Sequence, residues 1–189
     1  MRYRDKWHEY QDQWNRMVIK PNRLAEFERD ARRIIAHKDR YLAIEHATGV
    51  PWYMIGLIHL REASGDFSAY LGNGQPLSRR TTQVPAGRGP FPTFEAGAID
   101  ALKIDRLTDV HDWRLEKMLF HGESFNGTGY DLRGLPAPYV WGGTNIQRPG
   151  KYIADHVWSP TKWDTQPGIA PVLQLIAKLD PSVVLVRED

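Results

Sequence analysis

Glu62 is the residue of this sequence best placed to do acid–base chemistry. It follows residues 51–61, an apolar stretch that predicts a buried helix ending at this glutamate. Burial and the negative end of a helix dipole both raise the pKa of a carboxyl group. A carboxyl that stays protonated near neutral pH can donate its proton to a leaving oxygen atom. Arg61 would oppose the rise if it paired with Glu62, so a surface ion pair is the alternative interpretation.

A second polar group near Glu62 would decide which bond this acid helps to break. Glycoside hydrolysis pairs the acid with a group that activates water or stabilises the oxocarbenium ion. Asp66 is one candidate carboxylate, with a turn cap as the alternative. Glu123 is another, with a helix cap or an ion partner as the alternative. Ser and Thr in extended segments are by default only strand-forming. The side chains that could orient water are Ser64, Ser78, Thr81, Thr82 and Gln83.

Aromatic residues outside the predicted helices suggest how a sugar could be held. The chain has 7 Trp, 8 Tyr and 6 Phe, and many lie in segments without helical periodicity. Tyr and Trp rings can stack on the C–H faces of sugars while their polar atoms donate hydrogen bonds, although some of these rings must form core. The aromatic residues in such segments are Phe67, Tyr70, Phe91, Tyr130, Tyr139, Trp141, Tyr152, Trp158 and Trp163.

The elements that must position these residues are mainly helices. Apolar and aromatic residues predict helices over 4–17, 24–37, 51–61, 94–102, 113–120 and 169–179. Residues 41–47 either extend the second of these helices or form a short helix of their own. Gly72-Asn73-Gly74 lies between two short extended stretches, so a small hairpin is predicted within residues 66–90. Residues 121–167 are rich in Gly, Pro, Tyr and Trp and predict a long irregular segment, which is usually functional in a compact domain. Residues 183–186 are a candidate short strand.

The order of a buried helix, a terminal glutamate and a hairpin resembles the lysozyme superfamily, in which the hairpin forms one wall of the sugar cleft. Glu62-Ala63-Ser64-Gly65-Asp66-Phe67 looks like the Glu-Ser-x-x-Phe region of goose-type lysozymes and soluble lytic transglycosylases. The similarity is closer to the lysozyme-like endolysins of bacteria and phages. Residues 1–45 match no motif of that group. The motifs that carry the resemblance, in order over about residues 50–175, are Asn73-Gly74-Gln75-Pro76-Leu77, Arg80-Thr81, Val84-Pro85-Ala86-Gly87-Arg88, Asn126-Gly127-Thr128-Gly129-Tyr130, Pro138-Tyr139-Val140-Trp141 and Gly150-Lys151-Tyr152-Ile153-Ala154-Asp155.

The resemblance implies roles for the residues that fall on these motifs. Glu62 takes the role of the catalytic acid, and Thr81 is the first candidate for ordering the water, with Thr82 as the alternate. Asp66 stands where the family has Asn, so it is a candidate second catalytic group. Ala63 replaces the family Ser after the glutamate, which leaves a non-catalytic protein of the same fold open. The candidate substrate-binding residues are Tyr70, Thr82, Gln83, Asn126, Tyr130, Tyr139 and Trp141.

The expected fold is mainly α, of the α+β type: a lysozyme-like helical domain with a small β-hairpin lobe beside the cleft. One catalytic domain is expected over 1–189, with a helical N-terminal extension over 1–45 and the catalytic core over 50–175. The expected activity is that of a peptidoglycan hydrolase, an endolysin of the muramidase type. It would cleave the β-1,4 bond between N-acetylmuramic acid and N-acetylglucosamine. The alternatives are a lytic transglycosylase with 1,6-anhydro products, and a non-catalytic glycan-binding or virion structural module.

Composition excludes several other classes of protein. Without cysteine there can be no disulfide, no thiolate metal site and no cysteine nucleophile. The 7 histidines show no zinc-binding spacing, and acid catalysis with water requires neither metal nor cofactor, so none is expected. The net charge of +2 is too small to indicate nucleic acid as a partner. No apolar run reaches the length needed for stable membrane insertion.

The expected partner is the glycan strand of peptidoglycan, bound by a monomer. The N-terminus carries basic residues but not the apolar segment of an export signal. We therefore expect synthesis in the cytoplasm and access to the cell wall and periplasm through a holin-type lesion, as for phage endolysins. Residues 1–61 hold 12 basic and 8 acidic residues, so the N-terminal helices are candidates for contact with the outer membrane.

Overall fold

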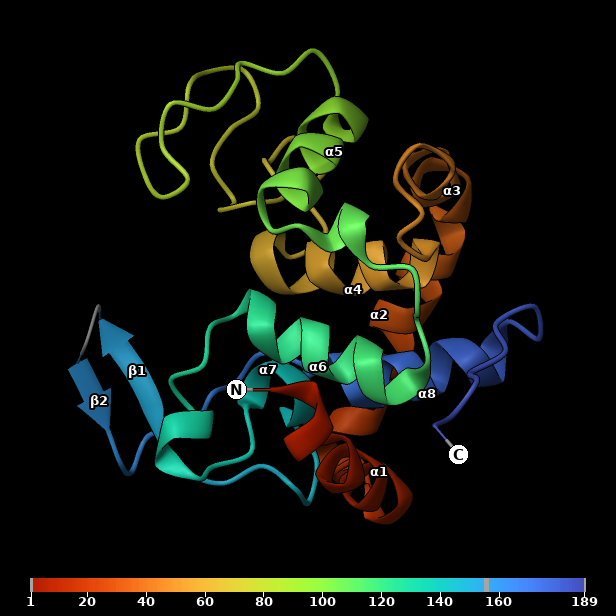
Figure 1. Cartoon of the computed structure of the whole chain (residues 1–189), viewed down its shortest axis with the longest axis vertical. Helices are drawn as coiled ribbons and strands as arrows, with labels where there is room; N and C mark the ends of the chain where they lie inside the picture. Colours follow the sequence, from red (N-terminus) through yellow and green to blue (C-terminus); the bar gives the residue numbers. More distant parts are fainter. Residues whose placement is uncertain (1, 155–156, 189) are drawn as a thin grey trace.

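Eight α-helices and a two-stranded antiparallel sheet make up the regular structure of residues 2–154 and 157–188, which the computed structural model describes (Figure 1). The protein is therefore mainly helical, as its sequence predicts. The helices are α1 (Trp7–Arg16), α2 (Leu24–Ala36), α3 (Lys38–Thr48), α4 (Trp52–Ala63), α5 (Phe94–Ile104), α6 (Leu115–Phe125), α7 (Pro138–Trp141) and α8 (Ile169–Leu179), and the strands are β1 (Lys151–Ala154) and β2 (Val157–Ser159).

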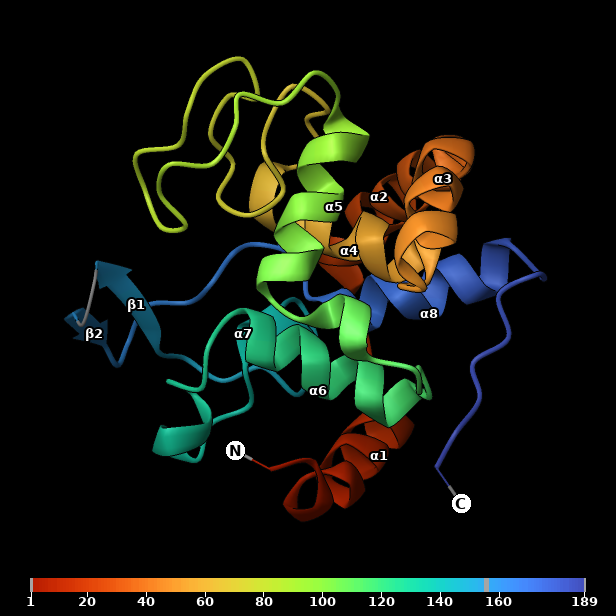
Figure 2. The same ribbon diagram turned by 45° about the horizontal axis from the view of Figure 1, so that its top comes forward.

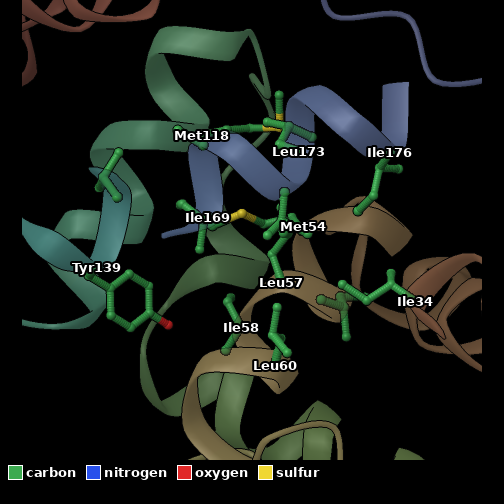
Figure 3. Close-up of a cluster of buried hydrophobic side chains, with 14 of the residues drawn as sticks. Ile34, Met54, Leu57, Ile58, Leu60, Met118, Tyr139, Ile169, Leu173 and Ile176 are labelled. Carbon is green, nitrogen blue, oxygen red and sulfur yellow. The ribbon is translucent and has the colours of Figure 1, made fainter. Parts of the chain in front are cut away.

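Helix α4 lies at the centre of the core, as its apolar sequence predicts. Gly49 ends α3 in a left-handed conformation and Pro51 precedes α4. Helix α4 then packs against α2, α3 and α8. At Gly56 a side chain would not fit, because a Cβ atom there would lie 2.5 Å from Ile34 Cγ2 of α2. Figure 3 shows apolar side chains of α2, α4, α6, α7 and α8 meeting in this core. Burial of each Leu or Ile side chain stabilises the folded state by about 1.5–3 kcal/mol relative to leaving that side chain exposed.

The N-terminal helices belong to the same core. Helix α1 packs against α6, and α2 packs against α8. Tyr10 of α1 is buried, and its hydroxyl donates a 2.8 Å hydrogen bond to Glu123 of α6. In α2 the buried residues are Phe27, Ala31 and Ile34, which lie at helical spacing. The expected N-terminal extension thus stabilises the helices that follow it.

The predicted hairpin within residues 66–90 does not form as a pair of strands. The turn is present, since Tyr70 N–H donates to the Gln75 carbonyl at 2.7 Å, but pairing stops at a single bridge between Ala69 and Pro76. Prolines lack the N–H that a ladder requires, and Pro76 and Pro85 interrupt this segment. The antiparallel pair of this fold is instead β1 and β2, in which Tyr152 lies opposite Trp158.

The end of one helix and one candidate strand also differ from prediction. Helix α6 begins at Leu115 and continues to Phe125, five residues beyond the predicted end, so Glu123 lies inside the helix. Residues 183–186 form no strand, although Val183 is buried and the Val186 carbonyl accepts a 2.8 Å hydrogen bond from Leu115 N–H. Asp155, the last residue of a predicted motif, lies outside the described residues.

The loop after α4 and the β1–β2 pair project from the same side of the molecule. Figures 1 and 2 show that this is also the side on which α4 ends. The end of α4 thus lies between two segments that are far apart in sequence. None of the helices in the described ranges has both the length and the apolar character needed to cross a bilayer.

Candidate functional site

The candidate site is built around the C-terminal end of α4. The helix ends in two consecutive left-handed residues, Ser64 (φ 52°) and Gly65 (φ 72°). A left-handed conformation is unusual for a residue other than glycine, and such residues cluster at functional sites. The following loop then folds back onto the helix end at Gly74, also left-handed, where a Cβ atom would lie only 2.9 Å from the carbonyl oxygen of Glu62. Glu62 therefore lies at the end of the core helix α4, and the loop that follows this helix returns to contact it.

The Glu62 carboxyl has the electrostatic setting of a proton donor. Its side chain is half-buried, and this burial is the main cause that raises its pKa. The Tyr139 hydroxyl and the Arg61 charge lower the pKa, whereas the negative charge of Asp105 raises it. The net result is a raised pKa, as predicted from the position of Glu62 at the end of a buried helix.

Tyr139 is the side chain that faces Glu62 from another element. It is on α7, is 1% exposed, and points its hydroxyl toward α4 (Figure 3). Burial and the charge of Glu62 raise the pKa of Tyr139 well above its ordinary value. Within the described residues this hydroxyl makes no hydrogen bond of good geometry, yet it lies close enough to Glu62 to lower the pKa of that carboxyl. The predicted role of Tyr139 as an open stacking surface is therefore wrong, because the ring is buried.

A pocket of about 510 Å³ opens beside Tyr139 and Arg61. Its volume is in the range of small-ligand sites. It brings together three residues that the sequence predicts for substrate binding, Asn126, Tyr130 and Tyr139. The full lining is Arg61, Asn126, Gly129, Tyr130, Leu132, Tyr139, Lys151, Tyr152, Ala154, Asp164 and Gln166.

Aromatic rings hold the β1–β2 pair against this pocket. Tyr130, Tyr152 and Trp158 meet edge to face, with ring centroids between 4.9 and 5.8 Å apart. Arg133 lies over the ring of Trp158 at 4.3 Å and donates a 3.1 Å hydrogen bond to the Tyr152 hydroxyl. Tyr130 is 6% exposed, so most of its ring serves this packing while it still lines the pocket.

Two other predicted stacking residues belong to the core. Trp141 is fully buried on α7, and Tyr70 is fully buried in the loop after α4. The Tyr70 ring stacks on Phe91 with centroids 5.1 Å apart, and its hydroxyl donates to Asp100 at 2.9 Å. Neither ring has a face exposed to a sugar, so the prediction that they bind substrate is wrong. Both side chains pack inward, Trp141 from the short helix α7 and Tyr70 from the loop after α4.

The polar residues of the loop after α4 are used to hold the loop together. The buried Thr81 hydroxyl donates to the Pro85 carbonyl at 2.6 Å and accepts from Arg88 N–H at 3.0 Å. The Asp66 carboxylate is exposed and accepts hydrogen bonds from Ser68 N–H at 2.8 Å and from the Ser68 hydroxyl at 2.7 Å. Asp66 is thus a turn cap, the alternative that the sequence left open.

The side chain of Gln75 makes hydrogen bonds to Thr82 and Gln83, the two remaining candidate residues of this loop. Its amide nitrogen donates to the Thr82 hydroxyl at 3.0 Å, and its amide oxygen accepts from the backbone N–H groups of Thr82 and Gln83 at 2.8 and 3.0 Å. Thr82 and Gln83 are both exposed. Neither lines the pocket beside Tyr139.

His59 is a satisfied core residue, as its sequence position favours. The Tyr41 hydroxyl donates to Nδ1 at 2.8 Å, and Nε2 donates to the carbonyl of Asp66 at 3.0 Å. Burial lowers the pKa of His59 to about 4, so the ring is neutral at neutral pH. Among the described residues no group of three or more His, Asp or Glu side chains could hold a metal ion.

Glu123 is a second buried glutamate outside this site. It is 3% exposed, and burial raises its pKa. One oxygen accepts the hydrogen bond from Tyr10, and the other has no hydrogen-bond partner among the described residues. Its contact is thus with α1, and it joins the N-terminal helix to α6.

Sequence reasoning missed several residues at the site. Asp105 follows α5, and its charge raises the pKa values of both Glu62 and Tyr139. Asp164 and Gln166 come from a segment about 100 residues away in sequence, yet they reach Arg61: the Gln166 amide donates to the Arg61 carbonyl at 3.0 Å. No local pattern marks these residues, because their proximity depends on how distant segments pack.

A scan for known protein families, a search of curated proteins and a search of solved structures each find no match. The function therefore has to be inferred from the geometry of the residues around Glu62.

Proposed function

We propose that this protein is a glycosidase that cleaves the glycan strands of peptidoglycan, with Glu62 as the general acid. The observation that carries the proposal is the half-buried Glu62 carboxyl at the end of α4, with its pKa raised by burial and the Tyr139 hydroxyl facing it. A carboxyl with a raised pKa keeps its proton to higher pH than a free glutamate does, and it can deliver that proton to a glycosidic oxygen. The pocket that Arg61 and Tyr139 line, in which Glu62 is not a lining residue, offers amide and phenol groups of the kind that bind sugars.

In the proposed reaction Glu62 protonates the oxygen of the β-1,4 bond between N-acetylmuramic acid and N-acetylglucosamine. The bond from that oxygen to the anomeric carbon then breaks, and positive charge develops on the sugar ring. The Glu62 carboxylate left behind is stabilised by Tyr139, whose hydroxyl lowers the pKa of Glu62. In the hydrolytic route a water molecule attacks the anomeric carbon and loses its proton to a base.

One observation favours a second route. The Thr81 hydroxyl hydrogen is already donated to Pro85, and the Asp66 carboxylate is already bonded to Ser68. Both predicted partners of Glu62 therefore already make hydrogen bonds within the loop. A lytic transglycosylase needs only one carboxylate: Glu62 would take back a proton from the C6 hydroxyl of the same sugar, and the C6 oxygen would close a 1,6-anhydro ring.

The test is digestion of purified peptidoglycan by the wild type and by Glu62→Gln, with the product masses recorded. The matched control is Asp66→Asn, which keeps a turn-capping side chain and should cleave as the wild type does. Products that carry a reducing muramic end and disappear in Glu62→Gln would support the hydrolase. Products that lack one water would support the transglycosylase. A folded wild type that releases no glycan fragments would overturn the proposal and favour a non-catalytic glycan-binding module.

A further inference from the structure

Arg61, the residue before Glu62, is a buried cation with few partners. It is 6% exposed and lines the pocket beside Tyr139. Its Nη1 atom donates to the Pro167 carbonyl at 3.2 Å, and its guanidinium lies over the Tyr139 ring at 4.6 Å. Its Nε atom is buried and has no hydrogen-bond partner among the described residues. A buried guanidinium N–H without an acceptor is costly, so this group has the capacity to bind an anion.

One carboxylate in the pocket wall is shared between two cations. Asp164 lies 3.8 Å from Arg61 Nη1 through one oxygen and 3.8 Å from Lys151 Nζ through the other. Both distances are longer than a charge-assisted hydrogen bond, which is about 2.7–2.9 Å. Asp164 also accepts a 2.8 Å hydrogen bond from Gln166 N–H. The described pocket lining therefore carries two positive charges and one negative charge, and neither cation is fully paired.

We propose that Arg61 and Lys151 form a carboxylate-binding subsite within this pocket. A guanidinium and an ammonium group on one wall match the charge of a carboxylate, and the phenol groups of Tyr130 and Tyr152 bound the same space. Lys151 is one-third exposed, so its side chain can move toward a ligand. Arg61 is instead fixed by its contacts with Tyr139 and Pro167.

The identity of the carboxylate rests on the proposed function. In peptidoglycan a carboxylate is carried by N-acetylmuramic acid, either on its own lactyl group in peptide-free strands or on the peptide attached there. N-acetylglucosamine carries none. Because Tyr139 contacts the Arg61 guanidinium and also faces Glu62, the subsite would place the muramic residue near the proton donor. The pocket would then distinguish peptidoglycan from neutral polymers of N-acetylglucosamine.

The test measures binding without turnover. Calorimetry is done with Glu62→Gln and a short peptide-free strand of alternating N-acetylglucosamine and N-acetylmuramic acid, and with the same strand after its lactyl carboxyls are amidated. Lys151→Gln in the Glu62→Gln background should weaken binding of the acidic strand about tenfold, the effect of losing one charge-assisted contact. It should leave binding of the amidated strand unchanged. Lys178→Gln, an exposed lysine on α8, is the matched control and should alter neither.

A peptide-bearing strand separates the two sources of the carboxylate. Lys151-dependent binding of the peptide-free strand identifies the lactyl carboxylate, whereas such binding only of the peptide-bearing strand identifies the peptide. Equal binding of acidic and amidated strands, an equal effect of Lys178→Gln, or no binding of any strand would overturn the subsite. These results are independent of cleavage, since the product masses of the wild type decide the proposed function.

Discussion

The end of α4 and the loop that follows it use similar polar residues in opposite ways. In the loop, the hydroxyl of Thr81, the carboxylate of Asp66 and the amide of Gln75 are all bonded to neighbours within the same segment. At the end of α4, the Nε of Arg61 and the hydroxyl of Tyr139 are buried without hydrogen-bond partners of good geometry in the described structure.

This difference separates polar groups that stabilise the fold from polar groups available for chemistry. Native proteins satisfy nearly all buried polar groups, so the exceptions call for an explanation. Here two such exceptions adjoin Glu62, whose own pKa burial raises. Residue type alone therefore does not identify a catalytic group, because a hydroxyl that already donates its hydrogen within the fold cannot also donate it to water or substrate.

The largest expected effect is a loss of activity on substitution of Glu62 that substitution of Asp66 does not cause. Loss of a general acid lowers a rate by about 10²- to 10⁴-fold, so Glu62→Gln should lower muropeptide release by that factor. Asp66→Asn should stay within a factor of two or three of the wild type, as estimated for a surface cap that keeps its acceptor. The rate of release from purified peptidoglycan measures both, with circular dichroism to confirm folding. Equal losses in the two variants would show that the loop carboxylate also takes part in catalysis.

Removal of the Thr81 hydroxyl should affect stability more than catalysis. Thr81→Val leaves the Pro85 carbonyl and the Arg88 N–H without their partner, which costs about 1–3 kcal/mol of unfolding free energy. Urea denaturation measures this loss, and Thr82→Val, at an exposed position, should change stability by less than about 0.5 kcal/mol. If Thr81→Val instead kept its stability and lost activity, the hydroxyl would belong to the reaction.

Glu123 tests how burial of a carboxyl group away from the candidate site affects the stability of the protein. Because burial raises its pKa in the folded state, its contribution to stability is complete at low pH and is lost as pH rises through that pKa. Glu123→Gln keeps an acceptor for Tyr10 and removes this loss, so the variant should gain stability relative to the wild type as pH rises from acidic to neutral. Denaturation at several pH values measures the gain.

The matched control for this position is Glu28→Gln on α2, where the described structure shows neither an ion pair nor a hydrogen bond of the side chain. Its stability should follow the wild type at each pH. A parallel pH dependence of Glu123→Gln and the wild type would show that Glu123 is not the group that titrates.

The smallest expected effect is a shift of the pH profile when the Tyr139 hydroxyl is removed. Its hydroxyl lowers the pKa of Glu62, so Tyr139→Phe should raise that pKa further. The protonated acid is the active form, and its rate falls as pH rises through this pKa. The basic limb of the pH profile of kcat/KM should therefore move to higher pH by a fraction of a pH unit. The unfolding free energy should change little, because the hydroxyl makes no well-formed hydrogen bond. A shift to lower pH would contradict this pairing.

Much of the helical fold follows from local sequence. The apolar run before Glu62 produces α4, Gly49 ends α3, and residues 169–179 form α8 as predicted. Helical periodicity is a property of a short segment, so it can be read without knowledge of the rest of the chain. The raised pKa of Glu62 follows from the same local pattern, since a glutamate at the end of a buried helix is itself partly buried.

The tertiary structure alone decided which polar and aromatic side chains remain available. Trp141 and Tyr70 have the composition of a sugar-binding surface, but neighbouring helices and loop residues cover them. Arg61 and Asp164 meet across about 100 residues of sequence, and no periodicity records such a contact. Sequence determined the position of Glu62 at the end of a buried helix because that setting is local. Packing determined its neighbours because burial and hydrogen bonding depend on which distant segments meet.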